Sequence, residues 1–370
     1  MKLGVDARLL SRPLTGIGRY TLEMCRALCK HPDLSLFLYS PAPIPAEVLR
    51  GLEPAKIRAG SWDNTLLRQI WGISILPRLA KQDSVDIFWG PSHRLPRFLP
   101  SSTTKVVTIH DLVWKYAGET MRPLSRIRER YQMPLAVQMA DLVFADSHAT
   151  KTSIIESFPL SKNKINVVHL GVTHFDSNPS KELLRPLNIK RPYFLFVGTL
   201  EPRKNLERLL AAFSQLPSHS RKNIDLVIAG GAGWGKVDIE NKVKELKLSS
   251  HVHLLGYVSD QTLNALYKHS KFLVMPSLYE GFGLPLVEAM AHGVPVLSSN
   301  NSSMPEVAGE AGFLVDPLDV NSIAHGLTEM INNDSLRNNL AAKAKLNVQR
   351  FNWDKSAQQF ITALKETIKY

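Results

Sequence analysis

The chain of 370 residues is too long for one ordinary hydrophobic core and fits two domains. Its apolar content of 44% excludes a disordered protein, and no apolar run approaches the roughly 20 residues that a membrane-spanning helix needs. The net charge is +12, with 23 Lys and Arg against 15 Asp and Glu in residues 1–180. A basic face of this kind suits nucleic acid, anionic lipid or phosphorylated substrates, or is simply a solvated surface.

The N-terminal segment MKLGVDARLL contains Asp6 and Arg8 within its apolar stretch. It therefore predicts a first β-strand rather than a signal peptide. Cys25 and Cys29 lie four residues apart on a predicted helix and share one face. Two thiols without further cysteines are too few for a structural zinc site, so they indicate a buried apolar stripe.

Strand-like and helix-like segments alternate along the chain. The runs that predict strands are residues 3–6, 34–40, 87–89, 106–109, 142–145, 165–168, 193–198, 226–229, 252–255, 272–275, 294–298 and 312–315. The runs that predict helices are residues 17–29, 206–215, 237–246, 260–269, 285–291 and 320–332, with a last amphipathic helix in residues 353–370. This alternation predicts an α/β fold with parallel sheets covered on both faces.

We expect two doubly wound domains, because the rhythm of strands and helices restarts after residue 190. The first comprises residues 1–175 and the second residues 190–352, joined within the polar, proline-containing segment 174–191. The helix of residues 353–370 lies beyond the last predicted strand and has to pack elsewhere. We expect it to return to the first domain.

Two glycines, Gly16 and Gly18, follow the first predicted strand and form a G-x-G turn. The dinucleotide fingerprint requires a third glycine at position 21, where this chain has Thr21. The turn is therefore weak evidence for a dinucleotide site. Its N–H groups still suit the close approach of a phosphate, next to Arg19.

A stronger motif is the segment LFVGTLEPRKN, residues 195–205. The predicted strand ends at Gly198, and the loop brings Arg203 and Lys204 to the carboxyl edge of the sheet, where ligands of open α/β sheets bind. Arg can fork onto two oxygens and Lys supplies a point charge, so the pair suits a diphosphate. The alternative is a solvated basic pair.

The segment SLYEGFGLPLVEAMAHG, residues 277–293, combines a phosphate-binding turn with two acids. Gly281, Gly283 and Pro285 predict a loop that opens a helix and presents N–H groups to an anion. Glu280 and Glu288 flank this turn, and carboxylates bind vicinal hydroxyls well. We therefore expect the amides and the two cations to bind a diphosphate, and the acids to bind sugar hydroxyls on either side of it.

Together these motifs resemble the retaining glycosyltransferases of the GT-B class, their family 4. The pattern E-x₇-E is spelled here by residues 280–288, and GTLEPRKN at 198–205 is similar to the phosphate loop of that family. Further similar segments are GVPVLS (293–298), MPEV (304–307), GFLVDP (312–317) and FNW (351–353). The resemblance covers nearly the whole chain and implies two Rossmann-like domains facing across a cleft.

The resemblance implies roles for individual residues. Arg203 and Lys204 would neutralise the leaving diphosphate, Glu280 would bind the transferred sugar, Glu288 the ribose, and His110 with Asp111 would face the donor sugar. The remaining expected donor-binding residues are Gly16, Gly18, Gly198, Tyr257, Val258, Gly281, Phe282, Gly283 and Leu284. Of these, Tyr257 and Val258 would frame the base, and Gly16 and Gly18 would close over the diphosphate. Expected catalytic residues are His110, Arg203, Lys204 and Glu280. No Asp-x-Asp occurs in the chain, so we expect no metal and no cofactor.

The expected substrates follow from the same resemblance. The donor would be a nucleotide sugar, with GDP-mannose favoured and UDP- or dTDP-sugars as alternatives. The acceptor would be a glycan or a polyprenyl-diphosphate-linked glycan in polysaccharide or lipopolysaccharide (O-antigen) synthesis. We expect a cytoplasmic protein, with the basic and apolar residues 65–78 and the arginines of 122–130 as a surface for an anionic membrane. A core helix beside the cleft is the alternative reading of residues 65–78.

Three other classes of function remain to be weighed. A non-catalytic sugar-nucleotide binder is disfavoured because no position of the family motifs is missing. A NAD-type oxidoreductase is disfavoured by Thr21 and by Ser40, which ends the second predicted strand where an acid is expected. A nucleic-acid protein would explain the charge but not paired acids around a phosphate turn, so we expect no nucleic-acid partner.

Overall fold

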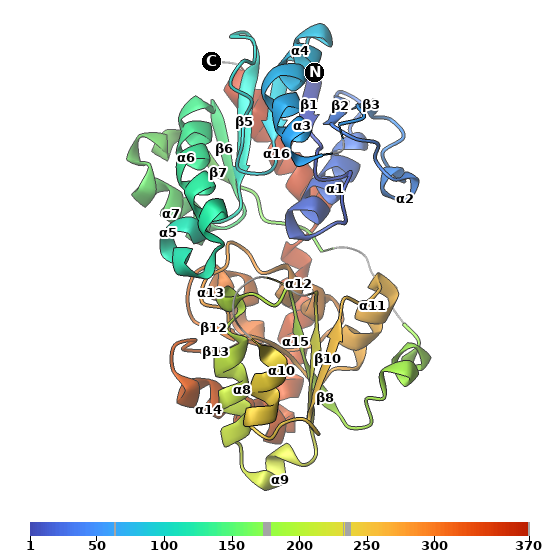
Figure 1. Ribbon diagram of the computed structural model, residues 1–370, viewed down its shortest axis with the longest axis vertical. Coiled ribbons are helices and arrows are strands. Elements are labelled where there is room, and N and C mark those ends of the chain that lie inside the picture. Colours follow the sequence, from blue (N-terminus) through green and yellow to red (C-terminus); the bar gives the residue numbers. More distant parts are fainter. Residues whose placement is uncertain (63, 173–178, 232, 234–237, 369–370) are drawn as a thin grey trace. The chain divides into compact units, whose positions relative to one another are not determined.

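A computed structural model describes residues 1–62, 64–172, 179–231, 233 and 238–368 of the chain (Figure 1). The chain divides into two compact units. The first comprises Met1–Leu112, Ile127–Gly171 and Phe351–Tyr370, and the second comprises Val113–Arg126 and Val172–Arg350. Parts of the expected joining segment 174–191 and of the predicted helix 237–246 lie outside the described residues.

The first unit is built on a seven-stranded parallel sheet in the order β3-β2-β1-β4-β5-β6-β7. Its strands are β1 (Lys2–Asp6), β2 (Ser35–Ser40), β3 (Lys56–Ala59), β4 (Ile87–Gly90), β5 (Thr104–Ile109), β6 (Leu142–Ala145) and β7 (Ile165–Val167). Its helices are α1 (Gly16–Cys29), α2 (Ala46–Leu49), α3 (Thr65–Ile70), the π-helix η1 (Trp71–Ile75), α4 (Leu76–Gln82), most of α6 (Pro123–Met139), α7 (His148–Ser157) and α16 (Trp353–Ile368).

The second unit has a six-stranded parallel sheet in the order β10-β9-β8-β11-β12-β13. Its strands are β8 (Tyr193–Val197), β9 (Asp225–Ala229), β10 (Val252–Gly256), β11 (Leu273–Met275), β12 (Val296–Ser299) and β13 (Gly312–Val315). Its helices are α5 (Val113–Tyr116), α8 (Leu206–Gln215), α9 (Ser218–Arg221), α10 (Ile239–Glu245), α11 (Asp260–His269), α12 (Leu284–Ala291), α13 (Met304–Ala308), α14 (Val320–Asn332) and α15 (Asp334–Asn347).

The expected fold class is confirmed, since both units are α/β with parallel sheets. All strands predicted from the sequence form, and α8, α11 and α14 begin and end where the amphipathic pattern predicts. The edge strand β3 was missed because its four residues are all exposed, so it lacks the apolar alternation that marks a half-buried strand.

The last helix, α16, packs on the first unit, where it appears in red among elements from the start of the chain (Figure 1). Its Phe360 stacks on Phe144 of β6 with ring centroids 4.3 Å apart, and lies 4.9 Å from the Trp89 ring of β4. The C-terminal segment thereby buries apolar surface against the sheet from which the chain started.

Aromatic residues also build the core of the second unit. Phe194 on β8 stacks on Phe272 at 5.1 Å between ring centroids and meets the edge of Phe213 on α8 at 5.2 Å. All three side chains are fully buried. This packing fixes β8, the strand that leads into the loop with the expected phosphate-binding residues.

Candidate active site

The loop after β8 carries the two adjacent cations to the carboxyl edge of the second sheet. The N–H of Gly198 donates to the Ala229 carbonyl at 3.0 Å. A Cβ atom added to Gly230 would lie only 1.9 Å from the Gly198 carbonyl oxygen, so the two loops approach each other as closely as a glycine allows. The loop then forms the short 3-10 turn η5 (Pro202–Lys204), which places Arg203 and Lys204 beside the segment that follows β11.

Both cations bind the same carboxylate, that of Glu280. Lys204 Nζ donates to Glu280 Oε1 at 2.7 Å, and Arg203 Nη1 donates to Glu280 Oε2. Arg203 also donates from Nη2 to Glu201 Oε1 and from Nη1 to the Tyr279 carbonyl. The four charged side chains form a mostly buried network with no net charge, and each guanidinium or ammonium position is fixed by ionic hydrogen bonds.

Glu280 thus departs from the expectation that its carboxylate is available to sugar hydroxyls. Burial raises the pKa of this carboxyl, but Arg203 and Lys204 more than offset that effect and lower the pKa to about 2. Glu280 is therefore ionised at neutral pH although it is only 7% exposed. A hydroxyl of the donor sugar can therefore bind Glu280 only if it shares the carboxylate with Arg203 or Lys204, or displaces one of them.

The turn between Glu280 and α12 is braced by residues that the sequence did not reveal. The single hydroxyl hydrogen of Ser303 is shared between the carbonyls of Glu280 and Phe282, which lie 3.0 and 3.1 Å from Oγ. The N–H of Glu280 donates to Ser302 Oγ at 3.1 Å, and Gly283 has φ +99°, a left-handed conformation that favours glycine. Because two carbonyl oxygens of the turn accept a hydrogen bond, they repel an anion at the helix start less strongly.

Asn205, directly after the cations, was also missed. Its Nδ2 donates to the carbonyls of Pro276 and Pro317 at 2.9 and 2.7 Å, and it adopts φ +62° at the start of α8. A left-handed Asn between a phosphate loop and a helix is a recognisable signal for such a tie. This residue ties the loop of Arg203 and Lys204 to the segments that follow β11 and β13.

Glu288, the second acid of the motif, lies one turn inside α12 and is 6% exposed. Tyr267 of α11 donates from its hydroxyl to Glu288 Oε2 at 2.7 Å, and the Tyr267 ring is fully buried and parallel to His292 at 5.9 Å. The hydroxyl therefore sets the direction of the Glu288 carboxylate. Sequence periodicity placed Tyr267 on a helix but gave no sign of this contact.

We expect Tyr267→Phe to raise the donor KM about three- to tenfold, with kcat nearly unchanged, because one hydrogen bond that orients Glu288 is lost. Steady-state kinetics of donor consumption would measure the two constants. The matched control is Tyr193→Phe, which also removes a buried hydroxyl, bonded at 2.8 Å to the Leu266 carbonyl. Equal effects of the two variants on KM would contradict the role assigned to Tyr267.

The residues expected to frame the base follow β10. Gly256 ends this strand with φ +66°, Tyr257 is 77% exposed and Val258 is partly exposed. They lie at the carboxyl end of the outermost strand of the second sheet. The exposed phenol ring offers a face for stacking, and its role with a base stays a prediction.

In the first unit, Gly16 and Gly18 open helix α1. A Cβ atom at Gly16 would meet no atom within 4 Å, whereas one at Gly18 would lie 3.2 Å from the Leu14 side chain. Gly16 therefore leaves open space at the helix start, while Gly18 permits the preceding loop to pack closely. The contact of Gly16 and Gly18 with a phosphate stays a prediction.

His110 follows β5, and both of its ring nitrogens are bonded inside the first unit. Nδ1 lies 2.6 Å from Asp146 Oδ2, and Nε2 donates to the Pro91 carbonyl at 2.7 Å. Burial lowers the pKa of His110, but the Asp146 carboxylate and the Pro91 carbonyl outweigh that effect and leave it raised. Because both ring nitrogens face oxygen acceptors, this arrangement describes a buried imidazolium. Asp111, the next residue, is partly exposed.

A second histidine, missed in the sequence, supports the first. His93 Nε2 accepts the backbone N–H of His110 at 2.9 Å, so its proton lies on Nδ1, which is 3.4 Å from Glu129 Oε2. The rings of His93 and His110 are 5.3 Å apart. The backbone at the end of β5 is therefore held by His93 of the loop after β4, and His93 is held in turn by Glu129 of helix α6.

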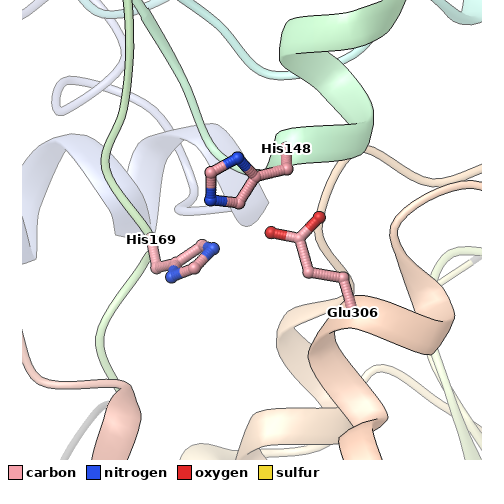
Figure 2. Close-up of side chains that lie close together, drawn as sticks. All are labelled: His148, His169 and Glu306. Atoms are coloured by element: carbon pink, nitrogen blue, oxygen red, sulfur yellow. The ribbon is translucent and has the colours of Figure 1, made fainter.

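Two more imidazoles lie at the same edge of the first sheet. His148 opens α7 just after β6, and His169 follows β7; their ring centroids are 5.9 Å apart in an edge-to-face arrangement (Figure 2). Glu306, also drawn, belongs to α13 of the other unit. His169 meets Phe351 at 5.9 Å. The carboxyl edge of this sheet is thus richer in histidine than the motifs indicated.

The structure brings together some of the expected residues within each unit. In the second unit, Arg203, Lys204 and Glu280 form one contact network, and Glu288 is bonded separately to Tyr267. In the first unit, His110 is tied to Asp146 rather than exposed as a free ring. Among the residues that the structure describes, no helix combines the length and the apolarity that crossing a bilayer requires.

Known proteins match this chain along most of its length. Residues 14–174 match the family described as Glycosyltransferase Family 4, and residues 180–347 match Glycosyl transferases group 1. The chain is 30% identical to O-antigen chain mannosyltransferase B of Escherichia coli, over 99% of this chain and 100% of that protein. It is 28% identical to the serotype-specific mannosyltransferase WbdA of Escherichia coli, over 74% of this chain and 35% of WbdA.

Solved structures share the fold at lower identity. Sucrose-phosphate synthase from Thermosynechococcus elongatus superposes with a TM-score of 0.78 at 19% identity, covering 100% of this chain and 99% of that one. HepE of Anabaena, solved with UDP and glucose, gives 0.75 at 20% identity and covers 99% of each chain. The expected GT-B fold is thereby confirmed. The chain belongs to the group 1 glycosyltransferases, glycosyltransferase family 4, and is a glycosyltransferase.

Proposed function

We propose that the chain transfers mannose from GDP-mannose, with retention, to a glycan or lipid-linked glycan acceptor in the synthesis of a surface polysaccharide such as an O-antigen. The choice of mannose rests on the relative whose name specifies O-antigen chain mannosyl transfer, which aligns with the whole chain at 30% identity. A nucleotide-sugar donor is supported by the similar fold of HepE, solved with UDP and glucose.

The observation that carries the proposal is the network of Arg203, Lys204 and Glu280 at the entrance of α12. Two fixed cations beside a helix start form a site where the charge of a leaving diphosphate is stabilised without rearrangement. Glu280 holds both cations in place, and its own carboxylate becomes available to a sugar hydroxyl when phosphate oxygens share those cations. Glu288 then binds the ribose from inside the helix.

The chemical step needs no nucleophile from the protein. The bond between the anomeric carbon and the diphosphate oxygen breaks, and the acceptor oxygen bonds to that carbon on the same face. The acceptor's proton passes to an oxygen of the departing β-phosphate, so nucleoside diphosphate and the new glycoside are the products. Arg203 and Lys204 act by stabilising the charge that develops on the diphosphate.

From the first unit, the proposal includes His110 and Asp111 on the donor sugar and Gly16 and Gly18 over the diphosphate. Since His110 Nε2 donates to the Pro91 carbonyl, a sugar hydroxyl has to take the place of that carbonyl. The raised pKa of His110 keeps its imidazole ring charged while the hydroxyl replaces the carbonyl. The protein then works in the cytoplasm, at the inner face of the membrane when the acceptor is lipid-linked.

A panel of nucleotide sugars tests this proposal without knowledge of the acceptor. GDP-mannose, UDP-glucose, UDP-N-acetylglucosamine and dTDP-rhamnose are incubated with the protein, and slow transfer to water is followed as release of nucleoside diphosphate. We expect GDP-mannose to be consumed fastest. UDP-glucose is the second candidate donor because of the HepE complex; its preference would correct the sugar and the base. Binding without turnover of any donor would instead favour a non-catalytic binder.

We expect donor turnover to persist in excess EDTA. The chain contains no Asp-x-Asp to hold a divalent cation against the diphosphate, and Arg203 with Lys204 can supply the positive charge. The rate is measured with and without EDTA in large excess over total divalent metal. Loss of turnover that Mn²⁺ restores would contradict this metal-independent route.

A further inference from the structure

The strongest unassigned feature is a cavity of about 490 Å³ within the first unit. It lies at the carboxyl edge of the sheet, between the segment after β1, the loop after β4, the π-helix η1 and helix α6. Ligands of parallel α/β sheets bind at this edge. None of the residues with expected donor roles lines it.

Four guanidinium groups line this cavity, which we name the arginine pocket: Arg8, Arg94, Arg97 and Arg128. Arg8 is neutralised by Asp6, with Nε 2.8 Å from Oδ1, and Arg94 lies 3.4 Å from Glu129. In the described part of the chain, no carboxylate pairs with Arg97 or Arg128. The pocket therefore carries an excess of positive charge that is not used to hold the fold together.

Mutual repulsion within the pocket is visible at Arg94. Burial lowers the pKa of its guanidinium, Glu129 raises it, and the nearby charges of Arg128 and Arg8 lower it again. Arg94 Nε is also buried without a hydrogen-bond partner among the described residues. Cations gathered at this density, with a donor left unsatisfied, fit an anion that accepts several hydrogen bonds.

Gly72 and Trp71 of the π-helix η1 form the surface against which the Arg8 guanidinium lies. A Cβ atom at Gly72 would lie 2.7 Å from Arg8 Nη2, so a larger residue at that position would push the guanidinium from its present place. Gly72 belongs to the π-helix Trp71–Ile75, an irregularity that is common at functional sites. Arg8 also lies over the Trp71 ring, 5.6 Å from its centroid.

The rim of the arginine pocket is apolar and open to solvent. Phe98 is 71% exposed and Ile73 56% exposed, and both line the cavity. Leu66 and Ile70, on the helix before η1, are exposed as well. Arg8 and Arg94 are partly buried, whereas Arg97 and Arg128 are exposed at the mouth near the apolar side chains. Guanidinium groups and large apolar side chains around one opening match a ligand with a phosphate group at one end and a hydrocarbon chain at the other.

We propose that the arginine pocket binds the diphosphate of an acceptor whose glycan is attached through that diphosphate to an apolar chain. The inference deepens the proposed function, on which it rests, by assigning the place where the diphosphate of a lipid-linked acceptor binds. Arg97 and Arg128 bind the phosphate oxygens, the side-chain amides of Gln69 and Gln132 are placed for hydroxyls, and Phe98 and Ile73 contact the hydrocarbon. A bilayer surface, by contrast, requires only diffuse positive charge.

Farnesyl diphosphate is a soluble probe of this chemistry, and its affinity can be measured by calorimetry with GDP present to occupy the donor site. We expect it to bind at least about tenfold more tightly than pyrophosphate or farnesol, because only the intact probe reaches both parts of the pocket. Equal affinities for farnesyl diphosphate and pyrophosphate would overturn the proposal.

The decisive variant is Arg97→Gln combined with Arg128→Gln. Both side chains are exposed, so the fold should survive, and thermal unfolding checks this. We expect the affinity for farnesyl diphosphate to fall about tenfold for each guanidinium removed, while donor hydrolysis stays within twofold. The matched control is Arg130→Gln, on the same helix but outside the pocket.

Three results with the variants would overturn the proposal. In the first, the double variant would bind farnesyl diphosphate as tightly as the native protein does. In the second, Arg130→Gln would weaken binding as much as the double variant. In the third, the double variant loses flotation with phosphatidylglycerol vesicles but keeps its affinity for the probe, which would make these arginines a membrane surface. Because binding is measured directly, absent donor turnover would count against the proposed function and leave the result for the pocket readable.

Discussion

Lys204→Ala is expected to lower kcat for donor consumption about 100- to 1,000-fold, the usual loss when one preorganised donor to a developing charge is removed. Lys204 is 8% exposed and its Nζ lies 2.7 Å from Glu280. Its charge is thus held in a mostly dry environment, where its interaction with a departing phosphate is strong. Donor affinity should fall as well, since the ground-state diphosphate shares the same contact.

Steady-state kinetics with saturating donor separate the two effects. Lys222→Ala, which removes an exposed lysine of the same unit, serves as the matched control and should leave both constants unchanged. A Lys204→Ala variant whose KM rises while kcat stays constant would assign this lysine to uniform substrate binding. That outcome would remove it from the account of leaving-group stabilisation.

Glu280→Gln is the second change with a large expected effect, because it leaves Arg203 and Lys204 mostly buried beside a neutral amide. Breaking a buried ion pair from one side typically costs about 3–5 kcal/mol. The lowered pKa of Glu280, about 2 against the ordinary 4.5, corresponds to roughly 3 kcal/mol of folding free energy at neutral pH. Chemical unfolding of the second unit should report a loss of this order.

The contribution of Glu280 to the free energy of unfolding should decrease as the pH falls. The unfolded state binds this proton more tightly than the folded state, so the contribution of Glu280 is complete above about pH 5 and is lost as the pH falls toward 2. The difference in unfolding free energy between native and Glu280→Gln should therefore shrink between pH 5 and pH 3. Glu240→Gln, at an exposed position, is the control. A difference that does not change with pH would contradict the ionised, cation-bound state of Glu280.

The sequence predicted the fold well because each unit repeats one pattern of buried strand and amphipathic helix. Helix α8 follows Asn205 as the pattern indicates, and its apolar face carries the fully buried Phe213. Strand β3 escaped because an exposed edge strand carries no periodic signal. The segment Val113–Arg126 belongs to the second unit, and adjacency in sequence offered no means of foreseeing that.

The site was predictable where chemistry depends on adjacent residues. Arg203 with Lys204, and Glu280 with the turn before α12, are short motifs, and the structure brings them into contact. The supports come from distant positions: Ser303 lies 23 residues from Glu280 and Tyr267 lies 21 from Glu288. Contacts at such separation depend on how strands and helices pack, which single-sequence patterns do not encode.

The central claim is that Arg203, Lys204 and the start of α12 bind one diphosphate. Calorimetric titration of GDP and of GMP into the native protein and into Arg203→Ala and Lys204→Ala tests it most directly, because the base and ribose are constant and only one phosphate differs. We expect the native protein to prefer GDP about tenfold or more, and each variant to lose most of that preference. Variants that weaken GDP and GMP equally, or not at all, would contradict the claim.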